Sequence, residues 1–172
     1  MINTQISRVI DQPQSVVWEL LSDASTPVDY HFLVTKVDLL STDNNNNNKK
    51  NAKRICHFTD GTCIHEDITQ VNDHQLKIVA SEFTMPMLKE MYANILVLPY
   101  EKDKNKTRVT FDVHYATYYG PFGYLMGHMM MKPMLKKVFA KVLAGVDEHL
   151  TTGKPVAKQG RSTKKWSSWV VE

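Results

Sequence analysis

Apolar and polar residues alternate along seven stretches of the chain, each about as long as a β-strand. In the fourth stretch, Ile64, Glu66 and Ile68 share one phase, and His65 and Asp67 share the other. Residues in one phase lie on one face of a strand, so the pattern predicts a sheet with one apolar face. The seven strands are expected at residues 3–10, 33–42, 52–58, 62–71, 75–83, 91–100 and 107–119.

Two other parts of the chain have helical spacing. Val16, Val17, Leu20 and Leu21 have helical spacing in a segment that Pro13 is suited to begin, and a second short helix is expected near residues 26–32. From residue 120 to about residue 150 the apolar period is again that of a helix. The order of elements therefore predicts an α+β protein.

The connections indicate how these elements are arranged. Asp60-Gly61 lies between two alternating strands, which is typical of a β-hairpin, and six strands follow one another without a helix. These six are therefore expected to pair in antiparallel fashion. A curved antiparallel sheet has an apolar concave face that must be covered. A final helix of about 28 residues spans roughly 40 Å, so it is expected to lie across that face.

Composition limits the possible classes of protein. The chain has 172 residues, of which 42% are apolar and 23% charged, as in a single folded domain. No apolar run approaches the roughly 20 residues of a membrane span, and the start lacks a secretory pattern, so a cytoplasmic protein is expected. Its two cysteines, Cys56 and Cys63, are accordingly expected to be free thiols.

Charge limits the possible partners. The formal charge is +3, and residues 154–165 carry five basic residues and no acidic one. The rest of the chain is slightly negative and has no basic face to meet a phosphate backbone. No nucleic-acid partner is therefore expected.

The chain is divided into a folded domain at residues 1–153 and a basic tail at residues 154–172. The tail lacks periodicity and is expected to be flexible. Trp166 and Trp169 beside its lysines suggest a weak contact with an anionic membrane surface. The asparagine-rich run at residues 43–51 is expected to be a loop.

Three segments resemble one known superfamily: ISRVIDQPQSVVWELLSD, GTCIHEDITQVNDHQLKIV and the long final segment that begins TRVTFDVHYATYYGPFGYLMGHMMM. With the order of elements, they are similar to the START/Bet v 1-like (SRPBCC) superfamily, within it to polyketide cyclase/dehydrase and lipid-transport proteins. The resemblance covers residues 2–150. It implies a helix-grip fold, in which a curved seven-stranded antiparallel sheet, with two short helices, has a long C-terminal helix across its concave face. It also implies a cavity for a hydrophobic small molecule between sheet and helix.

Strand phase and the stripe of the last helix predict the residues that contact such a lipid- or polyketide-like ligand. Methionine suits this wall because it is unbranched and adapts to ligands of different shape. Core packing is the alternative role of each methionine. The expected contacts are Phe83, Tyr92, Leu96, Phe111, Tyr115, Phe122, Leu125, Met126, Met129, Met130, Met134 and Val138.

The cluster of methionines around His128 also raises the possibility of a Cu(I) site, because thioethers select Cu(I). Met129, Met130 and Met131 are consecutive, however, and consecutive helical residues point to different sides. They cannot converge on one ion from a regular helix. The Cu(I) reading therefore ranks below the apolar pocket.

Glu66 is the candidate catalytic residue, because it lies between Ile64 and Ile68 on the predicted cavity face. A carboxyl group in such a place suits proton transfer, as a cyclase or dehydratase requires. Whether the protein is an enzyme or only a binding protein stays open at this point. His65 has the opposite phase and is expected at the surface. The sequence has no glycine-rich phosphate loop and no metal-ligand spacing, so no cofactor and no metal are predicted.

Overall fold

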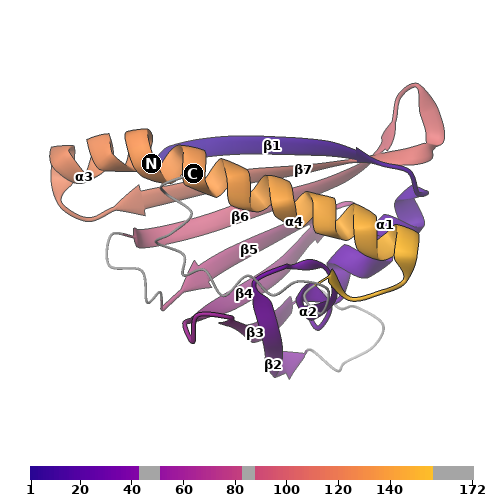
Figure 1. Ribbon diagram of the computed structural model, residues 1–172, viewed down its shortest axis with the longest axis horizontal. Helices are drawn as coiled ribbons and strands as arrows, with labels where there is room; N and C mark the ends of the chain where they lie inside the picture. Colours follow the sequence, from indigo (N-terminus) through magenta and orange to yellow (C-terminus); the bar gives the residue numbers. More distant parts are fainter. Residues whose placement is uncertain (43–50, 83–87, 157–172) are drawn as a thin grey trace.

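The computed structural model describes residues 1–42, 51–82 and 88–156, which form a seven-stranded antiparallel sheet crossed by a long helix (Figure 1). The strands are β1 (Ile2–Ile10), β2 (Val34–Thr42), β3 (Asn51–Phe58), β4 (Cys63–Asn72), β5 (Gln75–Ser81), β6 (Leu88–Tyr100) and β7 (Asp103–Thr117). The helices are α1 (Gln14–Ser22), α2 (Pro27–Tyr30), α3 (Gly120–Met126) and α4 (Lys132–Thr152), with the π-helical turn η1 (Gly127–Met131) between the last two.

The strand order is β1-β7-β6-β5-β4-β3-β2, so six strands form a meander and β1 pairs with the last of them. Helices α1 and α2 carry the chain from β1, at one edge, to β2, at the other. Successive side chains point to opposite faces of each strand. The register of every antiparallel pair therefore decides which residues face the helix.

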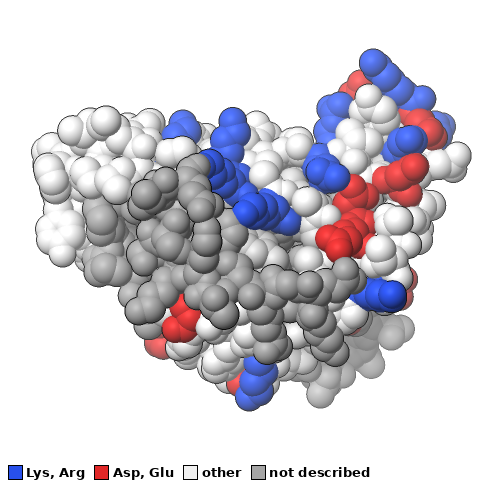
Figure 2. Space-filling view, in the orientation of Figure 1, with Lys and Arg blue, Asp and Glu red and all other residues white. Residues whose placement is uncertain are grey.

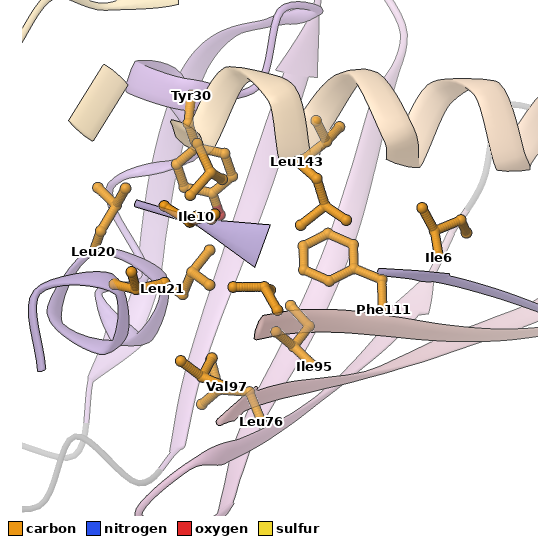
Figure 3. Packing of buried hydrophobic residues seen from close by; sticks show 14 of the residues in the cluster. Ile6, Ile10, Leu20, Leu21, Tyr30, Leu76, Ile95, Val97, Phe111 and Leu143 are labelled. Atoms are coloured by element: carbon orange, nitrogen blue, oxygen red, sulfur yellow. The ribbon is translucent and has the colours of Figure 1, made fainter. Parts of the chain in front are cut away.

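Helix α4 lies along the concave side of the sheet (Figure 1). Its buried residues Leu135, Val138 and Val142 follow the spacing of one helix face. Val138 and Val142 belong with Phe111 and Ile95 of the sheet to the largest hydrophobic cluster, part of which Figure 3 shows, and Leu135 belongs to a second cluster. This packing of a helix stripe on a strand face buries the apolar residues of both elements.

The last helical element is continuous from α3 to α4 but includes the π-turn. The Lys132 N–H donates to the Gly127 carbonyl, five residues back. Pro133 follows directly, and a proline both lacks an N–H and crowds the carbonyl four residues before it. A wider turn just before the proline relieves this crowding. Gly153, in the left-handed conformation at φ 68°, ends the helix, and its N–H donates to the His149 carbonyl at 2.8 Å.

The predicted helix-grip architecture is confirmed, with all seven strands and the covering helix in place. The differences are local: the final helix contains the π-turn, and β6 and β7 begin earlier than expected. Cys56 and Cys63 are free thiols, as predicted. No helix in the described ranges is long and apolar enough to cross a membrane. Most of the predicted tail, residues 157–172, lies outside the described residues.

Candidate functional site

A cavity lies between the concave face of the sheet and α4. Its empty space is about 820 Å³ including the open mouth, and about 90 Å³ of it admits the centres of water-sized molecules. The apolar part of the lining comes from alternate strand residues, from Pro27 of α2 and from one stripe of α4. These residues are Pro27, Val34, Phe58, Ile64, Ile78, Ala80, Met91, Ala93, Ile95, Phe111, Leu135, Val138, Phe139 and Val142.

Arg54 and Glu66 place one ion pair in this apolar surround. The turn around Asp60-Gly61 sets a register in which the two residues are direct cross-strand partners on β3 and β4. Arg54 Nε donates to Glu66 Oε2 at 2.6 Å, and Arg54 Nη1 donates to the Ala24 carbonyl at 3.0 Å. The side chains are only 6% and 17% exposed. Each charge is therefore compensated by the other inside the cavity wall.

The pKa of the Arg54 guanidinium is set by two opposing causes. Burial acts to lower it, but the neighbouring Glu66 carboxylate, with smaller contributions from Cys56 and Tyr30, outweighs burial and raises it. Arg54 is therefore a fixed cation in this wall, and Glu66 is its partner anion.

Two protonated groups border the same pair. Burial raises the pKa of the Cys56 thiol to about 12, and the Cys56 Sγ–H donates to Glu66 Oε2 at 3.5 Å. Burial likewise raises the pKa of the Tyr30 hydroxyl to about 12. At neutral pH both groups keep their protons, so neither is a nucleophile there.

His31 supplies a neutral imidazole. Its pKa is lowered to about 4, mainly by burial. The Leu33 N–H donates to His31 Nδ1 at 3.2 Å, so in the neutral ring Nε2 carries the proton. The ring stacks on Phe32 at 5.5 Å and lies beside Phe58 at 5.9 Å. The lining thus contains an N–H donor that carries no charge.

Among the predicted site residues, the structure places Glu66, Tyr92, Phe111 and Val138 in the cavity lining. Tyr115 and Met134 are buried but belong to a neighbouring hydrophobic cluster beyond the cavity. There the Tyr115 hydroxyl donates to the Gly127 carbonyl at 2.9 Å. Phe83 lies outside the described residues.

Leu96 requires correction, because it is absent from the lining, whereas Tyr92 borders the cavity although its side chain has the phase of the convex face. Tyr92 is the direct partner of His114, and Leu96 that of Thr110, so both share the convex face with polar partners. The Tyr92 ring stacks on His114 at 4.7 Å and lies under the Lys77 ammonium at 5.0 Å.

The residues predicted around the methionine cluster also require correction. Phe122, Leu125, Met129 and Met130 are exposed, and Met126 is half-buried, at the start of the final helical element. None of these five is part of the cavity lining. These residues belong to α3 and η1, whereas only later residues of the same helical element, from Leu135 to Val142, cover the cavity.

The consecutive methionines of the predicted Cu(I) site, residues 129–131, differ in exposure. Met129 and Met130 are exposed whereas Met131 is buried, so neighbouring side chains diverge as the angular argument predicts. His128 Nε2 lies 3.2 Å from the Tyr124 hydroxyl. Within the described residues, no group of three or more His, Cys, Asp or Glu side chains is placed to hold a metal ion.

Sequence reasoning missed Tyr30, His31, Arg54 and Cys56. For Arg54 the signal was present, because it shares its strand phase with the buried Ala52, Cys56 and Phe58. An arginine on the apolar face of a strand needs an oppositely charged partner, and the hairpin register places Glu66 opposite it. Tyr30 and His31 had no comparable signal, because α2 is a single short turn whose orientation depends on its contact with α4.

Comparison with known proteins gives one family. A model of the family described as polyketide cyclase/dehydrase and lipid transport matches residues 1–151. No curated protein matches the sequence.

Solved structures with the same fold are distant in sequence. A protein of Thermus thermophilus is 14% identical with a TM-score of 0.68, and the match covers 88% of this chain and 99% of that one. The Zhui aromatase/cyclase of a Streptomyces species is 11% identical with a TM-score of 0.63, covering 88% and 97%. A START superfamily protein of Mycobacterium smegmatis is 10% identical with a TM-score of 0.62, covering 86% and 93%.

Proposed function

The chain belongs to the polyketide cyclase/dehydrase and lipid transport family, and from this membership and its cavity we propose that it binds a neutral, largely apolar small molecule between the sheet and α4. The observation that carries the proposal is an apolar cavity with one charge-compensated polar wall. Pockets that bind small molecules commonly have this composition, with few polar groups that fix the orientation of the ligand.

The polar wall favours a neutral ligand. The Arg54 charge is matched by Glu66, so an anionic head group finds no unpaired cation there. His31 Nε2–H offers a donor to a carbonyl or hydroxyl oxygen, and the Glu66 carboxylate offers an acceptor to a hydroxyl. An aromatic or alicyclic molecule that carries a hydroxyl or carbonyl group fits this chemistry.

The size of the cavity adds a condition. Pockets for drug-sized ligands occupy about 300–1,000 Å³. The space in this cavity that admits the centres of water-sized molecules is smaller, about 90 Å³. A drug-sized ligand therefore requires lining side chains to move. Phe139 and Met91 are both only partly buried, which leaves them room to change rotamer.

Binding of 1-naphthol, a small neutral aromatic alcohol, tests the proposal by titration calorimetry. Ala93 lines the cavity, and Ala93→Phe should weaken binding at least tenfold because the new ring occupies the site. Ala116→Phe is the matched control, because Ala116 has the phase of the convex face. The anion 1-naphthoate should bind at least tenfold more weakly than 1-naphthol.

Equal binding to the Ala93 and Ala116 variants would refute the cavity as the site. Circular dichroism should first show that both variants fold, and Ala93→Leu replaces Ala93→Phe if it does not. Native mass spectrometry of the freshly purified protein then searches for the natural ligand, which should be absent from the Ala93 variant.

A second candidate is a cyclase or dehydratase in which Glu66 acts as general base. The position of Glu66 in the lining favours it, since a carboxylate can remove a proton from the carbon beside a ligand carbonyl. The electron pair then passes to the carbonyl oxygen, toward which His31 Nε2–H can donate. A short poly-β-ketone thioester is the test substrate, with cyclised product measured by mass spectrometry. Product formation no faster than without protein would exclude the enzyme while leaving the binding proposal intact.

A further inference from the structure

The chain exposes an unusual apolar surface at the start of its last helical element. This surface, the apolar end, consists of Tyr118, Tyr119, Phe122, Tyr124, Leu125, Met129 and Met130, which are between 41% and 69% exposed. In Figure 1, α3 projects past the ends of the strands, and in Figure 2 the same end of the molecule shows uncharged atoms. Contiguous exposed apolar side chains of this kind mark interaction sites.

Two glycines lie on the buried side of this helical segment. A Cβ at Gly123 would lie 1.7 Å from the Tyr118 carbonyl oxygen, in the turn that follows β7, and one at Gly127 would lie 2.6 Å from Ile2 Cδ1 of β1. The glycines thus let the helix backbone lie directly against this turn and the start of β1, and the large apolar side chains of the apolar end remain on the other sides. This reverses the usual surface helix, which buries its apolar side chains.

The turn that leads into α3 also contains an unusual backbone. Tyr119 has φ 72° and is followed by Gly120 at φ 56°, so two consecutive residues are left-handed. A tyrosine in this conformation is uncommon, and such strain is concentrated at functional sites. Tyr119 is 68% exposed, so the strained residue presents its ring outward rather than burying it.

The charges that follow the apolar end along the helix have one sign. The sequence has no acidic residue from 113 to 146, whereas Lys132, Lys136, Lys137 and Lys141 follow the apolar end along α4. Figure 2 shows basic side chains beside the uncharged end. Aromatic and aliphatic side chains flanked by lysines are typical of helices that lie in the interface of an anionic membrane.

We propose that the apolar end docks this protein on anionic lipid bilayers, with Phe122, Leu125 and Met129 entering the interface and the α4 lysines contacting lipid phosphates. The main competing occupant is a second copy of the chain. A symmetric dimer brings the same patch of each copy together, and the adjacent lysines of both copies would then repel each other. The inference goes beyond cavity binding and does not depend on it.

Sedimentation with vesicles tests the proposal without any cavity ligand. The full-length protein should bind vesicles of phosphatidylcholine with 30% phosphatidylserine at least tenfold more tightly than pure phosphatidylcholine vesicles. Phe122→Ser/Met129→Ser should weaken binding at least tenfold, and both sites are exposed, so the fold should persist. The matched control Leu40→Ser/Leu98→Ser removes two exposed apolar side chains elsewhere and should bind like the wild type.

Two further variants test the contribution of the lysines and the contribution of residues 157–172 to vesicle binding. Lys132→Gln/Lys136→Gln should reduce the preference for anionic vesicles about tenfold. A chain that ends at residue 156 should still bind, because the proposal assigns binding to the apolar end and not to residues 157–172. Loss of binding in that shortened chain, or unchanged binding of Phe122→Ser/Met129→Ser, would overturn the proposal. So would a wild-type dimer that this double variant dissociates and that does not sediment with vesicles.

Discussion

At the scale of single residues, the cavity wall depends on one buried ion pair and its neutral neighbours. Arg54 and Glu66 lie on the face of β3 and β4 that covers the cavity, while the adjacent pair Lys53 and Asp67 lies on the other face of the same strands. Both pairs are direct cross-strand partners, but they differ in exposure. They therefore allow a direct comparison of a buried and an exposed ion pair.

Removal of one member of the buried pair should destabilise the protein strongly. Arg54→Met or Glu66→Leu leaves a charge buried without its partner, and each should cost about 3–5 kcal/mol of the free energy of unfolding. The double variant should cost much less than the sum, because no charge remains buried. Lys53→Met or Asp67→Leu should each cost less than about 1 kcal/mol. Urea unfolding at pH 7 measures all five variants, and equal costs for the two pairs would contradict this reading of the wall.

His31 predicts a dependence of stability on pH. Its pKa is about 4 in the folded chain, chiefly because of burial, against 6.5 for an unperturbed histidine side chain. Between these values the unfolded chain binds a proton that the folded chain does not. The contribution of His31 to the free energy of unfolding is therefore fully present above pH 6.5 and is lost as the pH falls toward 4.

The expected loss from His31 between pH 7 and pH 4.5 is about 2 kcal/mol, from about 1.4 kcal/mol per pKa unit. His31→Gln removes this contribution while the nearby Glu66 and Arg54 stay in place. Urea unfolding at both pH values should show a loss about 2 kcal/mol larger for the wild type than for His31→Gln. Identical losses would show that His31 does not titrate in this range.

At the scale of elements, glycines determine how closely helices approach their neighbours. In α4, a Cβ at Gly145 would lie 2.1 Å from the Tyr30 carbonyl oxygen of α2. The close contact holds α2 against α4, and α2 carries Tyr30 and leads into His31. One glycine of the long helix thus positions part of the polar wall.

Gly145→Ala should therefore destabilise the protein although alanine is the better helix former. At an exposed helical position, glycine costs about 1 kcal/mol relative to alanine. At position 145 the clash with a backbone oxygen should outweigh that gain and cost about 1–3 kcal/mol. Ala140→Gly, at an exposed position of α4, measures the helix preference alone. Thermal unfolding of both variants tests this, and a raised melting temperature for Gly145→Ala would contradict the close contact.

At the scale of the whole molecule, one helical element has two different environments. Its later part, from Leu135 to Val142, covers the cavity, and its earlier part, from Phe122 to Met130, passes the ends of β1 and β7 and exposes apolar side chains. The π-turn η1 forms the end of this earlier part, just before Pro133. The proposed ligand site and the proposed membrane surface are thus consecutive along a single helix.

The sequence by itself determined the architecture and one wall of the site. Strand alternation, the Asp60-Gly61 hairpin and the helical period of the last segment are local signals, and each predicted its element. The phase of Ile64 and Ile68 placed Glu66 on the cavity face, where the structure has it. Hairpin register is also local, so even the pairing of Arg54 with Glu66 followed from the turn.

Tertiary structure decided the rest, because the remaining patterns were compatible with more than one arrangement. In β6 apolar residues occupy both phases, and only pairing with Phe111 and Val113 of β7 turned Ile95 and Ala93 inward and Leu96 outward. Apolar residues likewise continue through the whole final helical element. Which of them cover the cavity depends on how far the strands extend beneath the helix, a distance that arises from packing and that no local period encodes.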